Sequence, residues 1–449
     1  MSSALRKLGL LFYVVDRNST TFETPEEVPK IINEAIPMFT ILLLLEIGVI
    51  FLTGRGRVRM GDILSSSGHG LLYEMGKLVV HLGELSLYQW MYQYRLLDLD
   101  WRSAVTWWTA ALVTDFAYYW YHRAVHEVNI GWAAHQVHHS SQDYNLSTAL
   151  RQSVFQRYFS LPAYTPLALL GIPLPAIIVH VQINLLYQFW IHTELVGTLG
   201  PLEWVFNTPS HHRVHHGANK WCLDKNYAGV LIIWDRIFGT FEAERRDQPG
   251  QEIAYGLVDQ PQTHNTLSLQ LFYYRAVFTK ALSMSTWGDF FRALFYGPGW
   301  TPGSPRLGDP TTFPDVKAPR PVYGPKVPVW QQVYATTHYF ICLMVQQILV
   351  TNSEVLSWEV MACHLVFIVV TLGVIGGIYD QRWWCAWLDV ARCVTFLVYW
   401  THVVSVIPWP ALDSLMASIL AASALLQASR ALTGLWTSLT RQKKIIKKD

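Results

Sequence analysis

Residues 122–139 read HRAVHEVNIGWAAHQVHH, and residues 212–216 read HRVHH. These two stretches contain three histidine boxes: His122-x₃-His126, His135-x₂-His138-His139 and His212-x₂-His215-His216. Residues three or four apart project from one face of a helix, so each box directs two or three imidazoles the same way. The spacing therefore predicts helices whose histidine-bearing faces bind metal.

The number of imidazoles predicts two metal ions. A structural zinc takes about four ligands and a catalytic zinc about three plus water, so eight imidazoles exceed the needs of one such ion. The boxes contain no cysteine and few carboxylates lie near them, which disfavours iron–sulfur clusters and calcium. Iron, zinc, copper and nickel all accept imidazole ligands, and ligand type alone leaves that choice open.

The composition predicts an all-α, polytopic membrane protein, a helical transmembrane bundle with the di-metal site at its cytosolic face. Hydrophobic residues make up 51% of the chain and charged residues 15%, against about 25% charged in soluble domains. We expect apolar spans approaching the roughly 20 residues that cross a bilayer. They lie near residues 36–52, 71–92, 105–121, 161–190 (a hairpin), 333–350, 360–378, 387–407 and 412–426.

Charge and cysteine usage add three expectations. The first 30 residues lack the form of a signal peptide, so the first span is expected to be an uncleaved anchor. The basic end, residues 441–448, predicts a cytosolic tail, and the net charge of +2 gives no reason to expect a nucleic-acid partner. The five cysteines form no CxxC pair and are expected to be reduced.

Four regions follow from these patterns. Residues 1–100 carry N-terminal spans, and residues 101–300 carry the boxes and are expected to form the catalytic domain. Residues 301–332 form a linker rich in proline and glycine. Residues 333–449 carry the C-terminal spans and the basic tail, and their histidines are isolated.

His192 and three carboxylates join the site by position. The hairpin at 161–190 returns the chain to the side of the first two boxes, where His192 and then the third box follow. Asp115 lies two turns before His122, Glu127 follows His126, and Glu194 lies two residues after His192. Because metal-bound histidines commonly give their other N–H to a carboxylate, we expect all three carboxylates to support the ligands. A solvated surface position is the alternative for Glu127.

The residues around the boxes resemble the fatty acid hydroxylase and sterol desaturase superfamily of membrane di-iron oxygenases, over roughly residues 100–245. Longer phrases are similar to those of its ether-lipid-cleaving members, as is the C-terminal extension that begins with GPGW (297–300) and PRLG (305–308). These phrases are YWYH (119–122), HEVNI (126–130), HHSSQDYNLSTALRQ (138–152), YQFWIHTE (187–194), NTPSHHRVHHG (207–217) and KNYAGVLIIWD (225–235).

The resemblance implies an activity and its cofactors. Two irons would activate O₂, tetrahydrobiopterin would supply electrons, and the carbon next to the ether oxygen of a 1-O-alkylglycerol would be hydroxylated. The resulting hemiacetal would break to a fatty aldehyde and glycerol. The chain has no GxGxxG fingerprint or haem module, so it must take electrons from outside. Endoplasmic reticulum residence and an external pterin-recycling enzyme are also implied.

The resemblance carries over to the eight box histidines, with His192 as a ninth ligand. Gln188 stands where some members have another histidine, and His211 is a secondary candidate. Glu127 and Glu194 are expected to support the pterin or its proton transfer. Asn145 and Arg151 are expected to meet the pterin or the glycerol headgroup, with an ordinary surface loop as the alternative.

Three other functions remain open. A lipid-cleaving zinc hydrolase would need fewer ligands and a motif such as HExxH, which is absent. A transporter would scatter its histidines through several spans near the midplane. A fatty acid or sterol hydroxylase or desaturase that uses cytochrome b5 is the alternative within the oxygenases.

Overall fold

The computed structural model describes residues 3–245, 248–403 and 410–446, and all the regular secondary structure in this part of the chain is helical. Its β contacts are isolated bridges, such as Phe206 to Leu231, and no named strand is present in the described residues. The prediction of an all-α protein is confirmed. The chain divides into two compact units. The first comprises Met1–Gln262 and Leu269–Val322, and the second comprises Thr263–Ser268 and Tyr323–Asp449.

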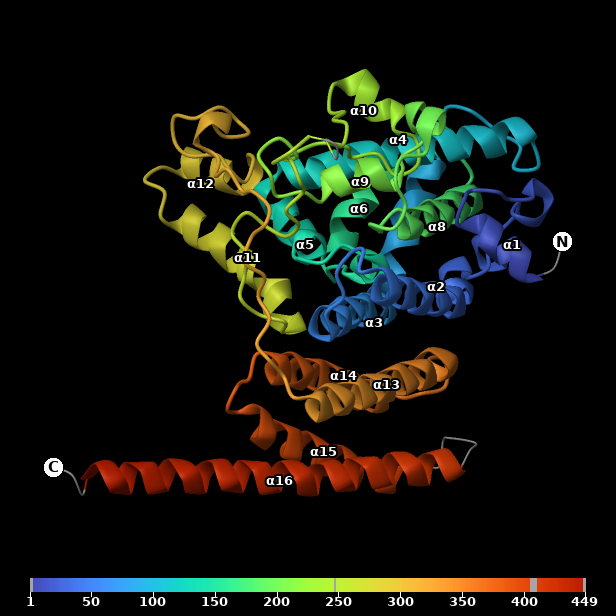
Figure 1. Ribbon diagram of the computed structural model, residues 1–449. Coiled ribbons are helices and arrows are strands. Elements are labelled where there is room, and N and C mark those ends of the chain that lie inside the picture. Colours follow the sequence, from blue (N-terminus) through green and yellow to red (C-terminus); the bar gives the residue numbers. More distant parts are fainter. Residues whose placement is uncertain (1–2, 246–247, 404–409, 447–449) are drawn as a thin grey trace. The chain divides into compact units, whose positions relative to one another are not determined.

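The first unit contains α4, α5 and α9 (Figure 1), and its residues include all the histidine boxes. Its α-helices are α1 (Ser3–Leu10), α2 (Ile31–Thr53), α3 (Met60–Tyr92), α4 (Ala104–Glu127), α5 (Asn129–His139), α6 (Gln156–Tyr164), α7 (Pro166–Leu169), α8 (Leu174–Trp190), α9 (Pro209–His215), α10 (Ile233–Phe238), most of α11 (Thr266–Leu282) and α12 (Trp287–Phe295). Five short 3₁₀ turns connect them: η1 (Arg17–Ser19), η2 (Pro25–Glu27), η3 (Leu146–Leu150), η4 (Gly200–Trp204) and η5 (Pro310–Thr312).

Helix α4 is the central element of this unit, because it packs against α5, α6 and α8. The hydroxyl of Ser103 accepts a hydrogen bond from the amide of Val105 and thereby caps its first turn. The last turn of α4 ends at Glu127, and α5 begins at Asn129, so only Val128 separates the two helices. This short connection brings the first and second boxes together.

The expected hairpin at 161–190 has one long limb and one broken limb. The long limb is α8. The other limb is divided into α6, which contains Pro162, and α7, which begins at Pro166. Gly171 makes the turn with a φ of 83°, and a Cβ placed there would lie 2.0 Å from the carbonyl oxygen of Leu97. Only glycine fits this left-handed, crowded position.

The second unit is built from four long helices: α13 (Val329–Asn352), α14 (Trp358–Tyr379), α15 (Cys385–Val403) and α16 (Pro410–Ile446). They pair in order, α13 with α14, α14 with α15 and α15 with α16. A buried ion pair between Arg392 and Asp389 lies among them, and Arg392 also bonds His338 of α13 and Thr371 of α14. Polar contacts of this kind hold apolar helices in register.

Four helical segments in the described residues are long and apolar enough to cross a membrane, which identifies a membrane protein. They are Pro25–Thr53, Val329–Asn352, Trp358–Tyr379 and Ser414–Trp436, and each matches an expected span. The helices at the other four expected spans do not reach that apolar length; α4, for example, carries Asp115 and Arg123 among its aromatic residues. The expected span at 387–407 runs into residues 404–409, and the basic tail reaches 447–448; both stretches lie outside the described residues.

Candidate metal centre

Four elements of the first unit bring nine histidines to one place. The last two turns of helix α4 carry the first box, and α5 carries the second. His192 lies two residues after the end of α8. The third box lies on α9, with His216 as the C-cap residue of that helix. All nine side chains are buried. The expected convergence of the boxes with His192 is therefore present in the structure.

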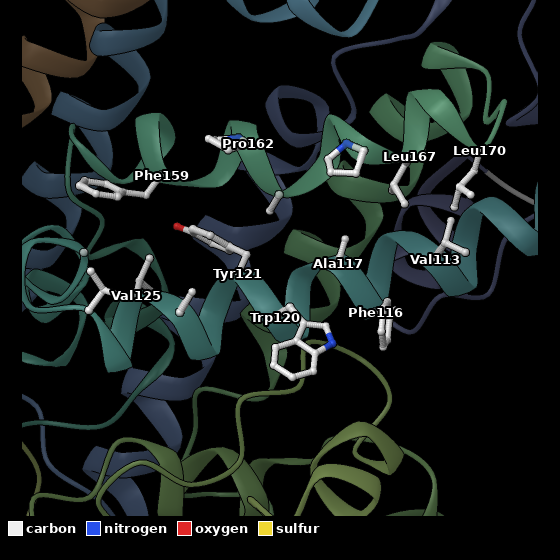
Figure 2. A pocket seen from close by; sticks show the side chains of 15 residues that line it. Val113, Phe116, Ala117, Trp120, Tyr121, Val125, Phe159, Pro162, Leu167 and Leu170 are labelled. Carbon is white, nitrogen blue, oxygen red and sulfur yellow. The ribbon is translucent and has the colours of Figure 1, made fainter. Parts of the chain in front are cut away.

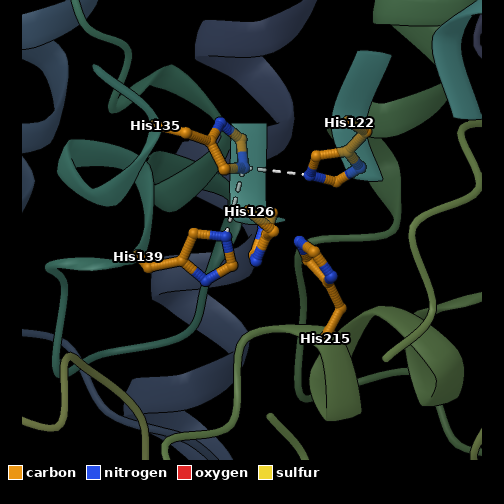
Figure 3. A group of neighbouring side chains, drawn as sticks. All are labelled: His122, His126, His135, His139 and His215. Carbon is orange, nitrogen blue, oxygen red and sulfur yellow. Dashed lines mark hydrogen bonds between the residues drawn. The ribbon is translucent and has the colours of Figure 1, made fainter. Parts of the chain in front are cut away.

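The nine imidazoles form two groups of candidate metal ligands. The first contains His122, His126, His135, His139 and His215 (Figure 3). The second contains His138, His192, His212 and His216. In each group, one ligand atom from every residue lies within 4.8 Å of the others. The rings of His139 and His216 stack with their centroids 4.4 Å apart, so the two groups are neighbours.

Backbone carbonyl oxygens determine which ring nitrogen faces the centre. Nδ1 of His122 lies 2.7 Å from the carbonyl oxygen of Tyr227, and Nδ1 of His192 lies 2.7 Å from that of Gln188. Nδ1 of His215 likewise lies 2.9 Å from the carbonyl oxygen of Lys225. A carbonyl oxygen only accepts hydrogen bonds, so these Nδ1 atoms carry the proton. Their Nε2 atoms are left with a free lone pair, which is the form that binds a metal.

Those Nε2 atoms converge without protein partners to satisfy them. Nε2 of His122 and Nε2 of His135 approach to 2.9 Å, and Nε2 of His212 and Nε2 of His192 approach to 3.0 Å. Nε2 of His126, His215 and His216 is buried and has no hydrogen-bond partner among the described residues. Buried polar atoms are normally satisfied, so a centre of this composition fits metal ions that accept these lone pairs.

Burial also keeps the imidazoles neutral. It lowers the pKa of His192 to about 3 and that of His215 to about 4, because the charged form loses its hydration. Burial, followed by repulsion among neighbouring imidazoles, lowers the pKa values of the other seven. Neutral imidazole is the ligating form, and nine such donors suit two ions of the iron, zinc, copper or nickel type.

Asp115 joins the helix that leads to His192 to the segment that follows Tyr227. Its carboxylate accepts hydrogen bonds from the amides of Val230 and Leu231, at 2.9 and 3.0 Å, and from Trp234 Nε1 at 3.0 Å. It also accepts one from Asn184 Nδ2 at 2.7 Å, on the helix that leads to His192. Asp115 therefore holds α8 and the segment at residues 230–234 together through these hydrogen bonds.

Glu127 lies at the end of α4 between two arginines. Its Oε1 accepts a hydrogen bond from Arg123 Nε at 2.7 Å, and its Oε2 lies 3.1 Å from Arg306 Nη1. The side chain is 14% exposed, so the carboxylate is partly reachable from solvent. Glu194 follows His192 by two residues, and its carboxylate lies close to Gly56. A Cβ added to Gly56 would lie 3.3 Å from Glu194 Oε2.

Asn145 and Arg151 are both buried in protein contacts. Asn145 caps η3 through its side-chain oxygen, and its Nδ2 donates to the carbonyl oxygen of Arg57. Arg151 forms an ion pair with Asp62 at 2.8 Å, and both side chains are almost fully buried, at 2% and 5% exposed. The backbone carbonyl oxygen of Arg151 lies 3.1 Å from His138 Nδ1.

Two carboxylates that were not predicted from the sequence support the first group. Asp224 Oδ1 lies 3.5 Å from Nδ1 of His126. Asp235 accepts the amides of Tyr227 and Ala228 at 2.8 Å each, which fixes the carbonyl that faces His122. Burial raises the pKa of Asp235 to about 6. Asp235 closes the phrase KNYAGVLIIWD, so the only signal for it was membership of that phrase.

Three further residues lie near the site but outside both groups. Gln188 donates to Asn184 and accepts from the hydroxyl of Tyr118, so its amide is committed to protein. The ring of His211 packs edge-on against Phe241, with the centroids 5.3 Å apart. His180 lies inside the core, where Nδ1 contacts the hydroxyl of Tyr13 at 2.8 Å.

Comparisons with known proteins agree with this site. The fatty acid hydroxylase family model matches residues 107–240, and the alkylglycerol monooxygenase C-terminal domain model matches residues 331–414. The chain is 43% identical to alkylglycerol monooxygenase from Homo sapiens, with 89% of each chain covered. It is 43% identical to the enzyme of that name from Danio rerio (87% and 86% covered) and 34% identical to that from Caenorhabditis elegans (88% and 82%). No solved structure matches.

Proposed function

The chain belongs to the alkylglycerol monooxygenase family, and on that basis we propose that it is a di-iron monooxygenase of ether lipids. Its substrates are 1-O-alkylglycerols and lyso-alkyl lipids. Hydroxylation of the carbon next to the ether oxygen gives a hemiacetal, which breaks to a fatty aldehyde and glycerol. One oxygen atom of O₂ enters the lipid, and the other leaves as water after taking up two electrons and two protons.

The observation that supports the proposal most strongly is the pair of histidine groups, with nine buried, neutral imidazoles. Such a donor set holds two ions, and the C–H bond beside an ether oxygen is beyond acid–base chemistry or hydrolytic zinc. Bound iron would supply the redox chemistry that this bond requires. The first group would hold one ion through His122, His126, His135, His139 and His215, and the second would hold the other through His138, His192, His212 and His216.

We assign supporting roles to the carboxylates from their contacts. Asp115 orients the segments that end at His192 and at the Tyr227 carbonyl. Glu127 and Glu194 support the pterin or carry protons to and from it, and the partial exposure of Glu127 suits that role. Asn145 and Arg151 remain the predicted residues for the cofactor or headgroup, although their observed partners all belong to the protein.

The proposal includes a cellular setting. Tetrahydrobiopterin is the electron donor, and an external enzyme recycles the oxidised pterin. The protein is a multi-pass protein of the endoplasmic reticulum membrane whose site faces the cytosol. Residues 101–300 carry the catalytic domain, and residues 333–449 embed and pack the chain. The four apolar helices support a location in the membrane. The relatives named for alkylglycerol support a lipid substrate.

A single assay separates the proposal from its alternative, a fatty acid or sterol hydroxylase or desaturase driven by cytochrome b5. Purified protein in lipid vesicles receives 1-O-octadecylglycerol and O₂, and only the reductant varies. We expect fatty aldehyde with tetrahydrobiopterin and none above background with NADPH, cytochrome b5 and its reductase. Aldehyde formation that ignores tetrahydrobiopterin and follows cytochrome b5 would reject the pterin assignment.

A further inference from the structure

An apolar groove of about 660 Å³ lies between α4 and the α6–α7 segment, beside the metal centre (Figure 2). Val113 and Leu170 line one end, and Val125, Phe159 and Gly131 line the other. Its volume falls within the range of about 300–1,000 Å³ that small-molecule sites occupy. The groove lies wholly within the first unit of the chain.

The lining accommodates hydrocarbon. It comprises aliphatic, aromatic and proline side chains, and small residues, among them Ala117, Ala124 and Ala163, keep the space between the helices open. The polar side-chain groups of the lining residues are the hydroxyl of Tyr121 and the indole N–H of Trp120. Figure 2 shows the Tyr121 ring between the two walls, on the side of Phe159 and Val125, whereas Trp120 points away from the α6–α7 wall.

One end of the groove reaches residues that touch the metal centre. Tyr121 precedes His122, and its hydroxyl donates to the carbonyl oxygen of Gln156 at 3.4 Å. The side-chain oxygen of the same Gln156 lies 3.4 Å from Nδ1 of His135. Gly131 lies one turn before His135 on α5, so both lie on the same face of that helix. A ligand in the groove would therefore have one end beside the five-histidine group.

The length of the groove matches a long alkyl chain. Val113 and Val125 are twelve residues apart on α4, which corresponds to about 18 Å of helix rise. A fully extended chain of single bonds advances about 1.2 Å per atom, so this distance accommodates about 15 carbons.

We propose that this groove binds the alkyl chain of the ether-lipid substrate, with the ether end at Tyr121 and Gly131 and the terminal methyl at Val113 and Leu170. This assignment rests on the proposed function and adds the determinant of chain-length preference to it. The length of the groove would set the preferred length of the alkyl chain. A chain that fills the groove buries its last carbons against Val113, whereas a shorter chain leaves that end empty. Each buried methylene contributes about a fourfold gain in affinity.

The test blocks the distal end of the groove and measures a series of chain lengths. The variant is Val113→Trp, and the matched control is Leu112→Trp, because Leu112 is the adjacent residue of α4, is exposed, and does not line the groove. With Val113→Trp, we expect kcat/KM for octadecylglycerol to fall about fifteenfold, the equivalent of two lost methylenes. Its value for decylglycerol should stay within about twofold. An unchanged chain-length profile, equal to that of Leu112→Trp, would overturn the proposal.

A binding experiment keeps this inference separate from the reaction. An octadecylglycerol with a photoreactive diazirine at its terminal carbon is crosslinked to the full-length protein in vesicles, and the labelled peptides are mapped. We expect labels at Val113 and Leu170 that unlabelled octadecylglycerol displaces and a phosphatidylcholine of equal chain length does not. Equal displacement by phosphatidylcholine, or labels elsewhere, would show a surface for bulk lipid and overturn the assignment.

Activity and labelling together distinguish the two possible failures. Labelled groove residues in a protein that cleaves no alkylglycerol would reject the proposed function and retain the alkyl-chain site. Cleavage with an unaltered chain-length profile in Val113→Trp would reject the site and retain the function.

Discussion

We expect His212→Ala to lose nearly all ether cleavage and His211→Ala to retain it. The two histidines are adjacent on α9 and both are buried, but only His212 belongs to the four-histidine group. Nε2 of His212 lies 3.0 Å from Nε2 of His192, so the alanine removes one of four converging lone pairs. Mutation of a residue that only hydrogen-bonds to a metal ligand typically lowers metal affinity or activity by about 10–100-fold. Loss of a ligand itself should have a larger effect, so we expect kcat to fall by more than about 100-fold.

Both variants are compared with the wild-type protein for aldehyde formation, for iron content and for elution in size-exclusion chromatography. Chromatography shows whether the alanine variant is still folded, and iron content shows whether the ligand itself was lost. Activity near the wild-type level in His212→Ala, or equal losses in both variants, would contradict the ligand assignment.

We expect Arg151→Met to lower the free energy of unfolding by about 3 kcal/mol, because it removes the buried guanidinium that pairs with the carboxylate of Asp62 at 2.8 Å. This is the lower end of the usual cost of breaking a buried ion pair, since Asp62 keeps Arg59, at 3.7 Å, and the hydroxyl of Ser141 as partners. Arg151 also bonds Ser66 and Ser140, so one side chain joins α3 to the segment after the second box. The same residue places its carbonyl oxygen against His138. Denaturant unfolding of the purified protein in detergent measures the change.

Arg95→Met is the matched control, since Arg95 forms an exposed ion pair with Asp98. Exposed pairs of this kind contribute about 1 kcal/mol at most. If Arg151→Met unfolds like the wild type and only raises KM for tetrahydrobiopterin, Arg151 binds the cofactor instead. The two roles predicted for this residue, structural and cofactor-binding, therefore give opposite results in one pair of measurements.

The grouping of the histidines was predictable from the sequence because helical spacing determines which side chains share a face. The boxes at 122–126, 135–139 and 212–216 each follow that rule, and His192 was placed by the hairpin that returns the chain. The all-helical fold and four of the eight expected membrane spans followed from composition and hydropathy. Local periodicity and hydropathy carried these inferences, and neither requires knowledge of tertiary contacts.

Contacts between distant segments were not predictable in this way. The carbonyl oxygens of Tyr227 and Lys225 that orient His122 and His215 belong to backbone, which no residue type reveals. The ion pair of Arg151 with Asp62 joins residues 89 positions apart, so a polar run that resembled a surface loop is buried. The groove depends on the break between α6 and α7, and its small residues acquire meaning only once those helices face α4.

The metal content of the purified, active protein tests the central claim most directly. The claim is that nine buried imidazoles hold two redox-active ions per chain, five histidines at one ion and four at the other. Mass spectrometry of the metals, normalised to protein concentration, should find two irons per chain, and activity should rise in proportion to iron. One zinc per chain and no iron in protein that cleaves alkylglycerols would contradict it.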